Sequence, residues 1–347
     1  MKILLAAFFL IIALPANAAV VFMYHRFGEG DYPSTNVTLA QFKAQLDFLQ
    51  REGFQVWPLP KLVMHLKQRE PVPDKVVAIT IDDAYVSVFE HAFPMLQERG
   101  MPFTVFVATG AVDRELSGYM SWAQLRALHA AGVTLANHGV SHDYLVRRKS
   151  GERAAEWMQR VRADMVGGQS RLQEEVDRDV NESPRLFAYP FGEYDLAMMD
   201  MLEQMGYVAF GQHSGPVGVH DNLRALPRFP VNERYGELAD FSLKARTLPF
   251  PVLDVSPVDP VVTGAVAPVL ELQFAENSAN LAQFTCYLGG ERMQVTWTDR
   301  EERKVEVSSE VPLPAGRSRY NCTAPHQSAN RWYWYSHPWI RLEEDSD

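Results

Sequence analysis

The stretch Val76-Val-Ala-Ile-Thr-Ile-Asp-Asp-Ala-Tyr85 decides the fold. Its first six residues are apolar except for Thr80, which is typical of a parallel strand buried on both faces. Side chains alternate along a strand, so the neighbouring carboxylates Asp82 and Asp83 can both reach one site only where the strand ends and the chain turns. α/β folds place their chemistry at such strand ends. The alternative interpretation is that the two aspartates cap the next helix.

Segments typical of strands and of helices alternate about seven times along the first two thirds of the chain, and no hairpin signal interrupts them. The expected strands are 20–26, 54–57, 76–81, 103–108, 133–136, 186–189 and 207–210. Helices are expected to start near Thr38, Leu59, Val88, Ser121, Glu152 and Leu196. This alternation predicts a parallel sheet wrapped by helices, either closed into a barrel or doubly wound.

The first 18 residues have the pattern of an export signal. Lys2 gives a short positive start, residues 3–14 form an apolar core, and Ala16-Asn-Ala18 is a small-residue cleavage site. The apolar run is too short to span a bilayer as a permanent anchor. We therefore expect a signal peptide at 1–18 and a mature protein that begins near Ala19, periplasmic or secreted, with no membrane span.

The charge balance excludes some classes of partner. The formal net charge is −10, and the sequence contains no block of Lys and Arg. Nucleic acids and anionic membranes are bound through such basic clusters, so neither is expected as a partner. A neutral or cationic substrate fits this charge better.

The composition changes near Leu248, which indicates a second domain. Four prolines follow within a short stretch, Pro249, Pro251, Pro257 and Pro260. Proline removes backbone donors and resists both helix and central strand, so 248–262 is expected to be a linker after a first domain at 19–247. The remaining segment, 263–347, alternates apolar and polar residues as half-buried antiparallel strands do. A chain of 347 residues is long enough for two domains, because single cores seldom exceed about 250–300 residues.

Both cysteines of the chain, Cys286 and Cys322, lie in this second domain. In an exported protein an isolated pair favours a disulfide, and the alternative is two buried thiols. A loop of about 37 residues closed in this way is worth roughly 3–4 kcal/mol of stability. Trp297 lies between the cysteines, and Tyr320 stands two residues before the second one. The segment therefore resembles a small immunoglobulin-like sandwich with a tyrosine corner.

Two histidines follow the strand at 133–136. His138 and His142 are four residues apart, so one helical turn would bring both imidazoles to the same side. Like Asp82 and Asp83, they begin just beyond a strand end. Two histidines and one carboxylate make a three-ligand metal site that leaves a position open for water. Zinc is the default ion for such ligands, and cobalt and manganese are alternatives.

Three motifs of the sequence resemble, in the same order along the chain, those of the polysaccharide deacetylases (carbohydrate esterase family 4, the NodB homology domain). They are Thr80-Ile-Asp-Asp-Ala-Tyr85, His138-x-x-x-His142 and Phe187-Ala-Tyr-Pro-Phe-Gly192. Met23-Tyr-His-Arg26 further resembles the branch that deacetylates biofilm poly-N-acetylglucosamine. The resemblance covers about Val20 to Asn232, and it implies a distorted (β/α) barrel with about seven strands.

The resemblance also implies roles for individual residues. It gives Asp83, His138 and His142 as metal ligands, and Asp82 as the base that takes a proton from the water on the metal. A backbone N–H near Phe191 would hold the oxyanion that develops on the substrate. Further residues expected to contact substrate or to line its pocket are Tyr189, Pro190 and His25.

Three departures from the family pattern affect these roles. Gly139 stands where the family usually has Ser or Thr, so one hydrogen bond behind the first histidine is missing. Ala188 stands where the third motif usually carries an arginine that orients the base, and Arg228 is the candidate to replace it from a later strand end. The family's acid motif is not evident. His213, directly after a strand, is the candidate to protonate the leaving amine, and the alternative is an exposed loop histidine.

These observations predict a metal-dependent hydrolase that removes N-acetyl groups from a glycan of N-acetylhexosamine units. One alternative keeps the metal and changes the bond, as in an O-acetyl esterase acting on xylan or another acetylated polymer. The other is a glycan-binding protein that has lost turnover. The presence of Asp82 argues against the second alternative, because a protein that only binds glycan needs no base beside metal ligands.

Overall fold

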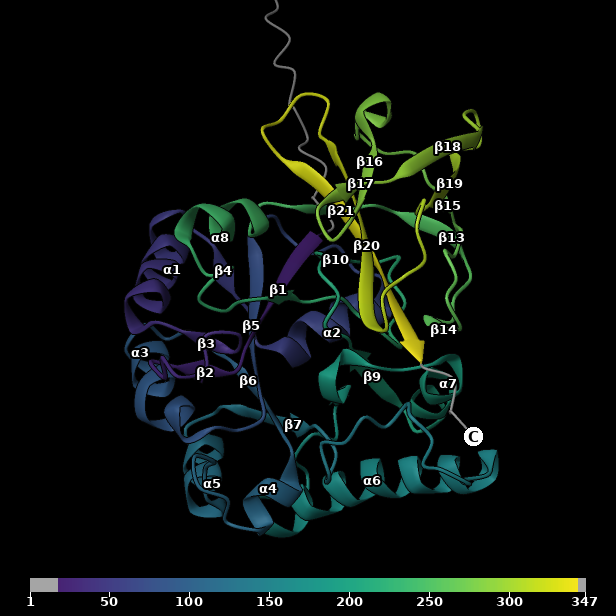
Figure 1. Ribbon diagram of the computed structural model, residues 1–347. Coiled ribbons are helices and arrows are strands. Elements are labelled where there is room, and N and C mark those ends of the chain that lie inside the picture. The colour runs from purple at the N-terminus through teal and green to yellow at the C-terminus, as the bar shows by residue number, and fades with distance from the viewer. Residues whose placement is uncertain (1–17, 343–347) are drawn as a thin grey trace, which may run out of the picture.

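The structure is a computed structural model that describes residues 18–342 (Figure 1). The predicted signal peptide therefore lies outside the described residues, apart from Ala18, which begins the first strand. Among the described residues, no helix is both long enough and apolar enough to cross a membrane.

A curled, mainly parallel sheet forms the core of the first domain (Figure 1). Across the sheet its main strands lie in the order β1 (Ala18–Tyr24), β5 (Val76–Asp82), β6 (Thr104–Val107), β7 (Thr134–Asn137), β8 (Arg185–Ala188) and β9 (Tyr207–Phe210). The short strand β4 (Gln55–Val56) pairs beside β5. All seven strands expected from the sequence are thus present, within two residues of their predicted ends.

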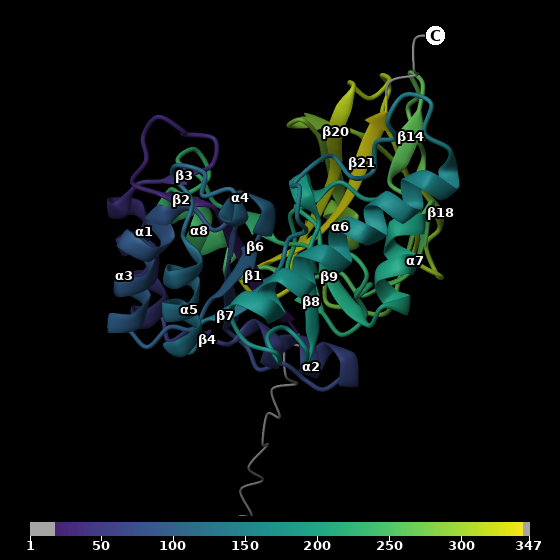
Figure 2. The same cartoon turned by 90° about the horizontal axis from the view of Figure 1, so that it is seen from below.

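Helices cover the outside of this sheet, as the alternating pattern predicts (Figure 2). They are α1 (Leu39–Arg51), α2 (Leu59–Gln68), α3 (Phe93–Glu98), α4 (Thr109–Asp113), α5 (Trp122–Ala130), α6 (Ala154–Glu175), α7 (Leu196–Gln204) and α8 (Leu238–Lys244). Thr38 and Ser121 each form a capping box, in which a glutamine three residues later completes the reciprocal bonds. The helix expected at 88–96 begins instead as a π-helical turn, Val88–Ala92, that leads into α3.

Within residues 18–342 the sheet is not closed by regular strand pairing. Its edge strands are β9 and the short β10 (Val217–Gly218), which runs antiparallel to β1. Irregular backbone bridges the gap: the Ala209 N–H donates to the Leu223 carbonyl, and the Leu226 N–H donates to the Ala209 carbonyl. β11 (Phe229–Pro230) then pairs parallel to β1. The expected barrel is therefore a curled sheet, and the segment that joins its two sides carries Arg228.

The second domain consists of a mixed sheet and an antiparallel sheet, packed around a core of its own. One contains β12 (Leu248–Pro249), β14 (Val261–Thr263), β16 (Thr285–Leu288), β17 (Glu291–Arg292), β20 (Gly316–Pro325) and β21 (Trp332–Leu342). The other contains β13 (Val252–Ser256), β15 (Leu270–Phe274), β18 (Gln294–Asp299) and β19 (Lys304–Ser308). The expected all-β domain is present.

Its details differ from the immunoglobulin-like expectation. Cys286 and Cys322 form the predicted disulfide, but they are direct neighbours on β16 and β20 of the same sheet, whereas the immunoglobulin disulfide joins two sheets. The Tyr320 hydroxyl donates to the carbonyl of Pro268, far upstream in the chain, at 2.9 Å, whereas a tyrosine corner reaches back only a few residues. Residue spacing alone does not distinguish these arrangements.

The segment predicted to be a linker, 248–262, is part of this second domain. It carries β12 and β13 and begins β14, and these pair with β21 or β15. Pro249 is tolerated because β12 is a short edge strand, where a missing N–H costs no ladder bond, and Pro251, Pro257 and Pro260 lie between strands.

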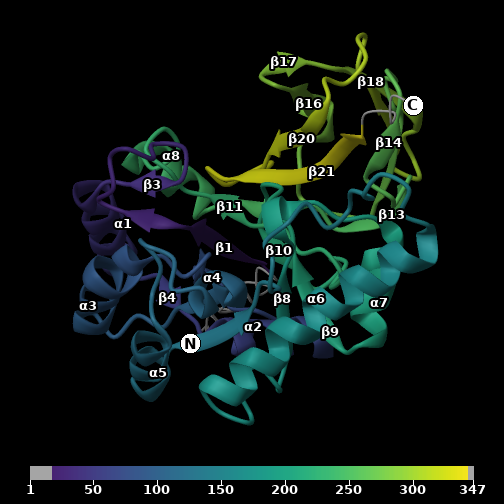
Figure 3. The same cartoon turned by 60° about the horizontal axis from the view of Figure 1, so that its bottom comes forward.

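The hairpin of β20 and β21 connects the two domains (Figure 3). Trp334 of β21 packs edge-on against Phe229, with ring centroids 5.3 Å apart. Ile340 is buried in the same cluster as Phe187 of β8. The C-terminal end of β21 thereby lies beside β9 and α7 of the first domain (Figure 1).

Candidate metal centre

The two aspartates at the end of β5 face one site because the backbone turns sharply between them and the next helix. Asp82 is the last residue of the strand. Asp83 and Ala84 both have positive φ angles, 75° and 61°. Left-handed backbone is costly for non-glycine residues, and such strain gathers at functional sites. The turn gives Asp83 a direction that regular strand alternation would deny it.

The two histidines meet through a loop, not through the helical turn that their spacing suggested. Residues 138–142 follow β7 without helical structure, and Gly139 and His142 have φ angles of 77° and 53°. Asp164 of α6 holds the loop, because its carboxylate accepts the backbone N–H groups of Val140 and Ser141, each at 2.9 Å. A Cβ atom at Gly139 would lie 2.3 Å from the Asp164 carboxylate. The glycine at this position is therefore required by the loop.

Asp83, His138 and His142 converge on one point. A ligand atom from each lies within 4.8 Å of the other two. Nε2 of His138 is 3.3 Å and Nε2 of His142 is 3.0 Å from the Asp83 Oδ1 atom. Asp83 Oδ1 and His138 Nε2 are buried without a normal hydrogen-bond partner among the described residues. Unpaired buried polar atoms are costly, and two imidazole nitrogens with one carboxylate oxygen suit a divalent cation such as zinc. The site fits a metal ion.

A hydrogen bond orients the first histidine as a ligand. The His138 Nδ1 atom lies 2.7 Å from the carbonyl oxygen of Ala188. Because a carbonyl only accepts, Nδ1 carries the proton and the lone pair of Nε2 faces Asp83. Ala188, at the end of β8, thus contributes its backbone where its side chain has no polar group.

Arg228 makes a two-pronged ion pair with Asp82. Its Nη1 and Nη2 atoms donate to the two carboxylate oxygens at 2.7 and 2.8 Å, and both side chains are fully buried. Nε donates to the carbonyl of Gly211 at 3.0 Å, and Nη1 also lies 3.2 Å from the Thr80 hydroxyl. The sequence analysis expected Arg228 to approach the base from a later strand end; it pairs with Asp82 from the irregular segment directly before β11.

Both aspartates are held in the anionic form. Burial alone would raise the pKa of Asp82, but the Arg228 charge, with His138 and His25, lowers that pKa below its usual value. Burial also opposes ionisation of Asp83, whose pKa is nevertheless well below its usual value because of its contacts with His138 and His142. The site therefore presents one carboxylate as a metal ligand and a second, clamped carboxylate beside it.

His25 and Phe191 border the same site. Burial lowers the pKa of His25, while the charges of Asp83 and Asp82 oppose this effect, so this imidazole lies within electrostatic reach of both carboxylates. Phe191 has a φ angle of 58° in the turn Pro190–Gly192. Its ring packs against the His142 imidazole, with centroids 4.6 Å apart.

Two other predicted site residues have different surroundings. The Tyr189 side chain is fully buried, and its hydroxyl donates to the Arg224 carbonyl at 2.9 Å, so it packs the core behind the turn. His213 is buried too. Burial lowers its pKa to about 3, with contributions from Arg319 and His337 of the second domain. No described hydrogen bond or ring contact joins His213 to Asp83, His138 or His142.

The sequence analysis missed Asp164, which shapes the histidine loop, and Thr80, whose hydroxyl lies beside Arg228. It also missed an aromatic rim next to Asp83. The guanidinium of Arg26 lies 3.5 Å from the ring centroid of Tyr85 and 4.0 Å from that of Tyr32. The rings of Tyr85 and Tyr119 are 4.7 Å apart. The sequence held one signal for this rim, Tyr85, the aromatic residue that ends the Asp-Asp motif.

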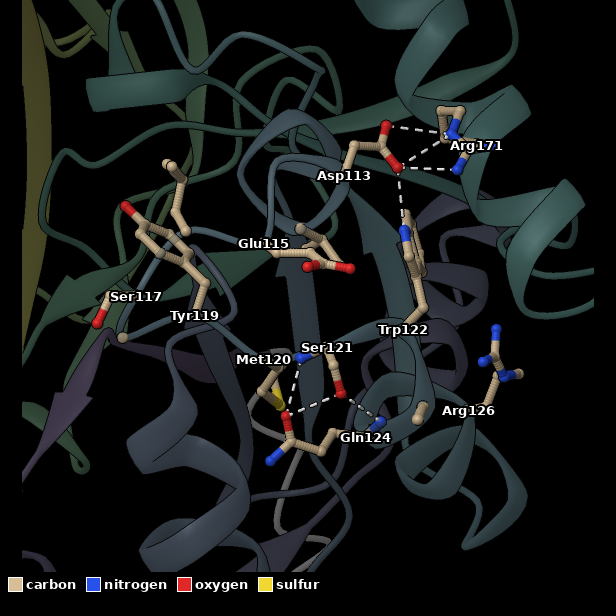
Figure 4. A pocket seen from close by; sticks show the side chains of 14 residues that line it. Asp113, Glu115, Ser117, Tyr119, Met120, Ser121, Trp122, Gln124, Arg126 and Arg171 are labelled. Carbon is tan, nitrogen blue, oxygen red and sulfur yellow. Dashed lines mark hydrogen bonds and ion pairs between the residues drawn. The ribbon is translucent and has the colours of Figure 1, made fainter.

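A pocket of about 640 Å³ opens beside Tyr119 (Figure 4). It is lined by the end of α4, the following loop, the start of α5 and Arg171 of α6. Figure 4 shows Glu115 between Tyr119 and Trp122. The loop is joined to the turn after Asp83, because the Met120 N–H donates to the Ala84 carbonyl at 2.9 Å. The pocket therefore meets the aromatic rim at Tyr119.

Comparison with known proteins agrees with this site. Residues 69–210 match the family described as polysaccharide deacetylase. The chain is 24% identical over 252 residues to the poly-beta-1,6-N-acetyl-D-glucosamine N-deacetylase of Escherichia coli K12, covering 62% of this chain and 36% of that protein. It is 20% identical over 219 residues to the enzyme of that name from Staphylococcus aureus N315, covering 63% and 75%. The chain thus spans about a third of the length of its Escherichia coli relative.

Solved structures show the same fold for the first domain. IcaB from Ammonifex degensii is 25% identical, with a TM-score of 0.56, over 67% of this chain and 98% of that one. The deacetylase PplD from Streptococcus pyogenes is 19% identical, with a TM-score of 0.58, over 67% and 99%. The first domain of this chain is thus similar to the polysaccharide deacetylases in its motifs, in the match of residues 69–210 and in its fold.

Proposed function

We propose that this protein hydrolyses N-acetyl groups of a poly-N-acetylglucosamine-type glycan outside the cytoplasm, releasing acetate and leaving free amines. The relatives named as poly-beta-1,6-N-acetyl-D-glucosamine N-deacetylases support this substrate class. The predicted export signal supports the location.

One observation carries the proposal: a three-ligand cluster, Asp83, His138 and His142, lies next to a separate buried carboxylate, Asp82, that is clamped by Arg228. A divalent cation bound by these ligands would supply Lewis-acid chemistry and lower the pKa of water towards about 7. Zinc is the ion that the ligand types favour, with cobalt and manganese as alternatives. A protein that only binds glycan gains nothing from the clamped carboxylate.

Asp82 acts as the general base in this proposal. Arg228 occupies one lone pair on each of its oxygens, and a carboxylate offers about four such sites, so acceptor capacity remains. Asp82 takes a proton from the attacking water, whose oxygen bonds to the acetamide carbonyl carbon. A backbone N–H of the Pro190–Gly192 turn donates to the carbonyl oxygen as negative charge develops there.

Breaking the C–N bond requires a proton for the leaving amine. The sequence analysis favours His213 for this role, but the surroundings of His25 favour His25. It lies within reach of the charges of Asp82 and Asp83, and its side chain is only partly buried. His213 is buried beside charges of the second domain. We therefore assign His25, as the imidazolium that the charges of Asp82 and Asp83 favour, as the donor of the proton to the leaving amine, and His213 to the domain boundary.

The aromatic rim supplies the place for the sugar. Tyr32 is half exposed, and its ring lies against Arg26, which also covers Tyr85. Aromatic faces stack on apolar ligand surfaces while nearby polar groups set orientation. The pocket beside Tyr119 offers room for neighbouring units of the chain.

The direct test measures acetate released by the purified protein from poly-N-acetylglucosamine oligomers and, in parallel, from acetylated xylan. We expect release from the first substrate, and we expect Asp82→Asn to lower its rate by about 10²–10⁴-fold because the base is lost. Xylan deacetylation alone would make the protein an O-acetyl esterase. Unchanged activity of Asp82→Asn would reject the mechanism.

Replacing Arg228, which pairs with Asp82, should change the pH dependence of kcat/KM. Because Arg228 lowers the pKa of Asp82 while burial raises it, Arg228→Met should move the acidic limb of the kcat/KM profile to higher pH. Arg228→Lys should shift it less, because a cation remains. The profile is recorded at a temperature where both variants are folded, since breaking a buried ion pair costs about 3–5 kcal/mol. An acidic limb that stays in place would contradict the pairing as the source of the low pKa.

The identity of the acid is tested by comparing two histidine variants. His25→Gln should lower kcat about 100-fold through loss of proton transfer, whereas His213→Gln should lower kcat by less than about threefold. Glutamine keeps a polar side chain at both positions. The opposite ranking would restore His213 as the proton donor.

A further inference from the structure

The second domain contacts the Phe191 turn, which borders the metal centre, through the side chain of Arg317. Arg317, near the start of β20, donates from Nη1 to the carbonyl oxygen of Phe191. The same nitrogen donates to the Gln212 side-chain oxygen at 3.2 Å, and Nε lies 3.8 Å from a carboxylate oxygen of Glu193. One guanidinium from the β domain therefore joins the turn after β8 to the segment after β9.

The Pro190–Gly192 turn, which Arg317 contacts, has strained backbone and packs against His142. Phe191 and Gly192 both have left-handed backbone, with φ angles of 58° and 69°. A non-glycine residue in this region costs of the order of 1–3 kcal/mol and persists only where its surroundings hold it. The Phe191 ring lies between the His142 imidazole and Tyr144, on which it stacks at 3.9 Å. Movement of the turn would therefore disturb the His142 side of the centre.

Glu193 extends the same network. Its side chain is almost fully buried, and its carboxylate accepts from Arg147 at 3.1 and 3.3 Å. Arg147 follows the histidine loop and lies over the Tyr144 ring, 4.1 Å from its centroid. Arg147 and Arg317 thus approach one buried carboxylate from opposite domains. The loop of His142, the Phe191 turn and β20 are tied into one unit.

We propose that Arg317 is a positioning residue, through which the C-terminal β domain holds the Pro190–Gly192 turn in its working geometry. Its effect on turnover rests on the proposed function, in which this turn stabilises the developing oxyanion. Its effect on the geometry of the turn does not depend on the proposed function. The β domain is then part of the catalytic apparatus and not a separate module.

A second arginine offers a matched control. Arg331 also crosses from the β domain to the first domain, donating to the Arg246 carbonyl at 2.7 Å and to the Asp74 carboxylate at 2.8 Å. Its partners lie outside the metal centre. Arg331→Ala therefore removes a comparable contact between the domains without touching the turn. This variant measures the effect of a weakened contact between the domains alone.

The first measurement is hydrogen exchange on the metal-free, full-length protein. Two amides report the turn, because the Gly192 N–H donates to Tyr189 and the Glu193 N–H donates to Pro190. In Arg317→Ala we expect the peptide spanning 189–194 to exchange about fivefold faster, as expected for loss of one net hydrogen bond. In Arg331→Ala this peptide should exchange at the wild-type rate. Equal exchange in both variants would overturn the proposal.

The second measurement separates kcat from KM for acetate release. Misplacement of catalytic groups by about 1 Å can cost about 100-fold, so we expect Arg317→Ala to lower kcat by about tenfold or more with KM within twofold. Arg317→Lys should recover part of the loss, and Arg331→Ala should match wild type. Equal kcat in all variants would overturn the catalytic part of the proposal. If wild type releases no acetate, the proposed function fails, while the exchange experiment still decides whether Arg317 holds the turn.

Discussion

The buried ion pair between Asp82 and Arg228 is the contact on which the rest of the site depends. Two fully buried charges are tolerated only when each satisfies the other with good geometry, and here both carboxylate oxygens and three guanidinium nitrogens are engaged. The pair fixes the last residue of β5 and keeps it ionised. Asp83, one residue on, is then free to turn towards the histidines.

This contact also ties late parts of the chain to early ones. Arg228 lies in the irregular segment between β9 and β11, and β11 pairs with β1. The guanidinium also lies over the rings of Phe106 and Phe210, from β6 and β9. The open side of the curled sheet is therefore closed around the base by the residue that orients it. In the usual family pattern the third motif provides this arginine. Here Ala188 of that motif provides a carbonyl for His138 instead.

The sequence was sufficient to predict those parts of the site that are short-range. Apolar runs located the strands, and residues at their ends, Asp82, Asp83 and His138, identified the centre. Arg228 was identified because the usual arginine was missing. Predictions failed where tertiary contacts decide the outcome. The histidine loop depends on Asp164 of the following helix, α6, and 248–262 forms short strands whose partners, β15 and β21, lie later in the chain.

Other residues could not be placed from the sequence because their partners lie far along the chain. Tyr189 belongs to the third motif, yet its side chain faces the core and bonds to Arg224. Arg317 has no motif of its own, and its relation to Phe191 depends on how the β20–β21 hairpin docks. Spacing carries no information on such contacts, since the first depends on how the chain folds back within one domain and the second on the packing of two separate cores.

X-ray absorption at the metal edge of the purified protein tests the central claim most directly. The account predicts one divalent ion per chain, bound by two imidazole nitrogens and a carboxylate oxygen at about 2.0–2.2 Å, and loss of that ion in His138→Ala. A protein without a stoichiometric ion, or one whose ion keeps the same ligands in His138→Ala, would contradict it.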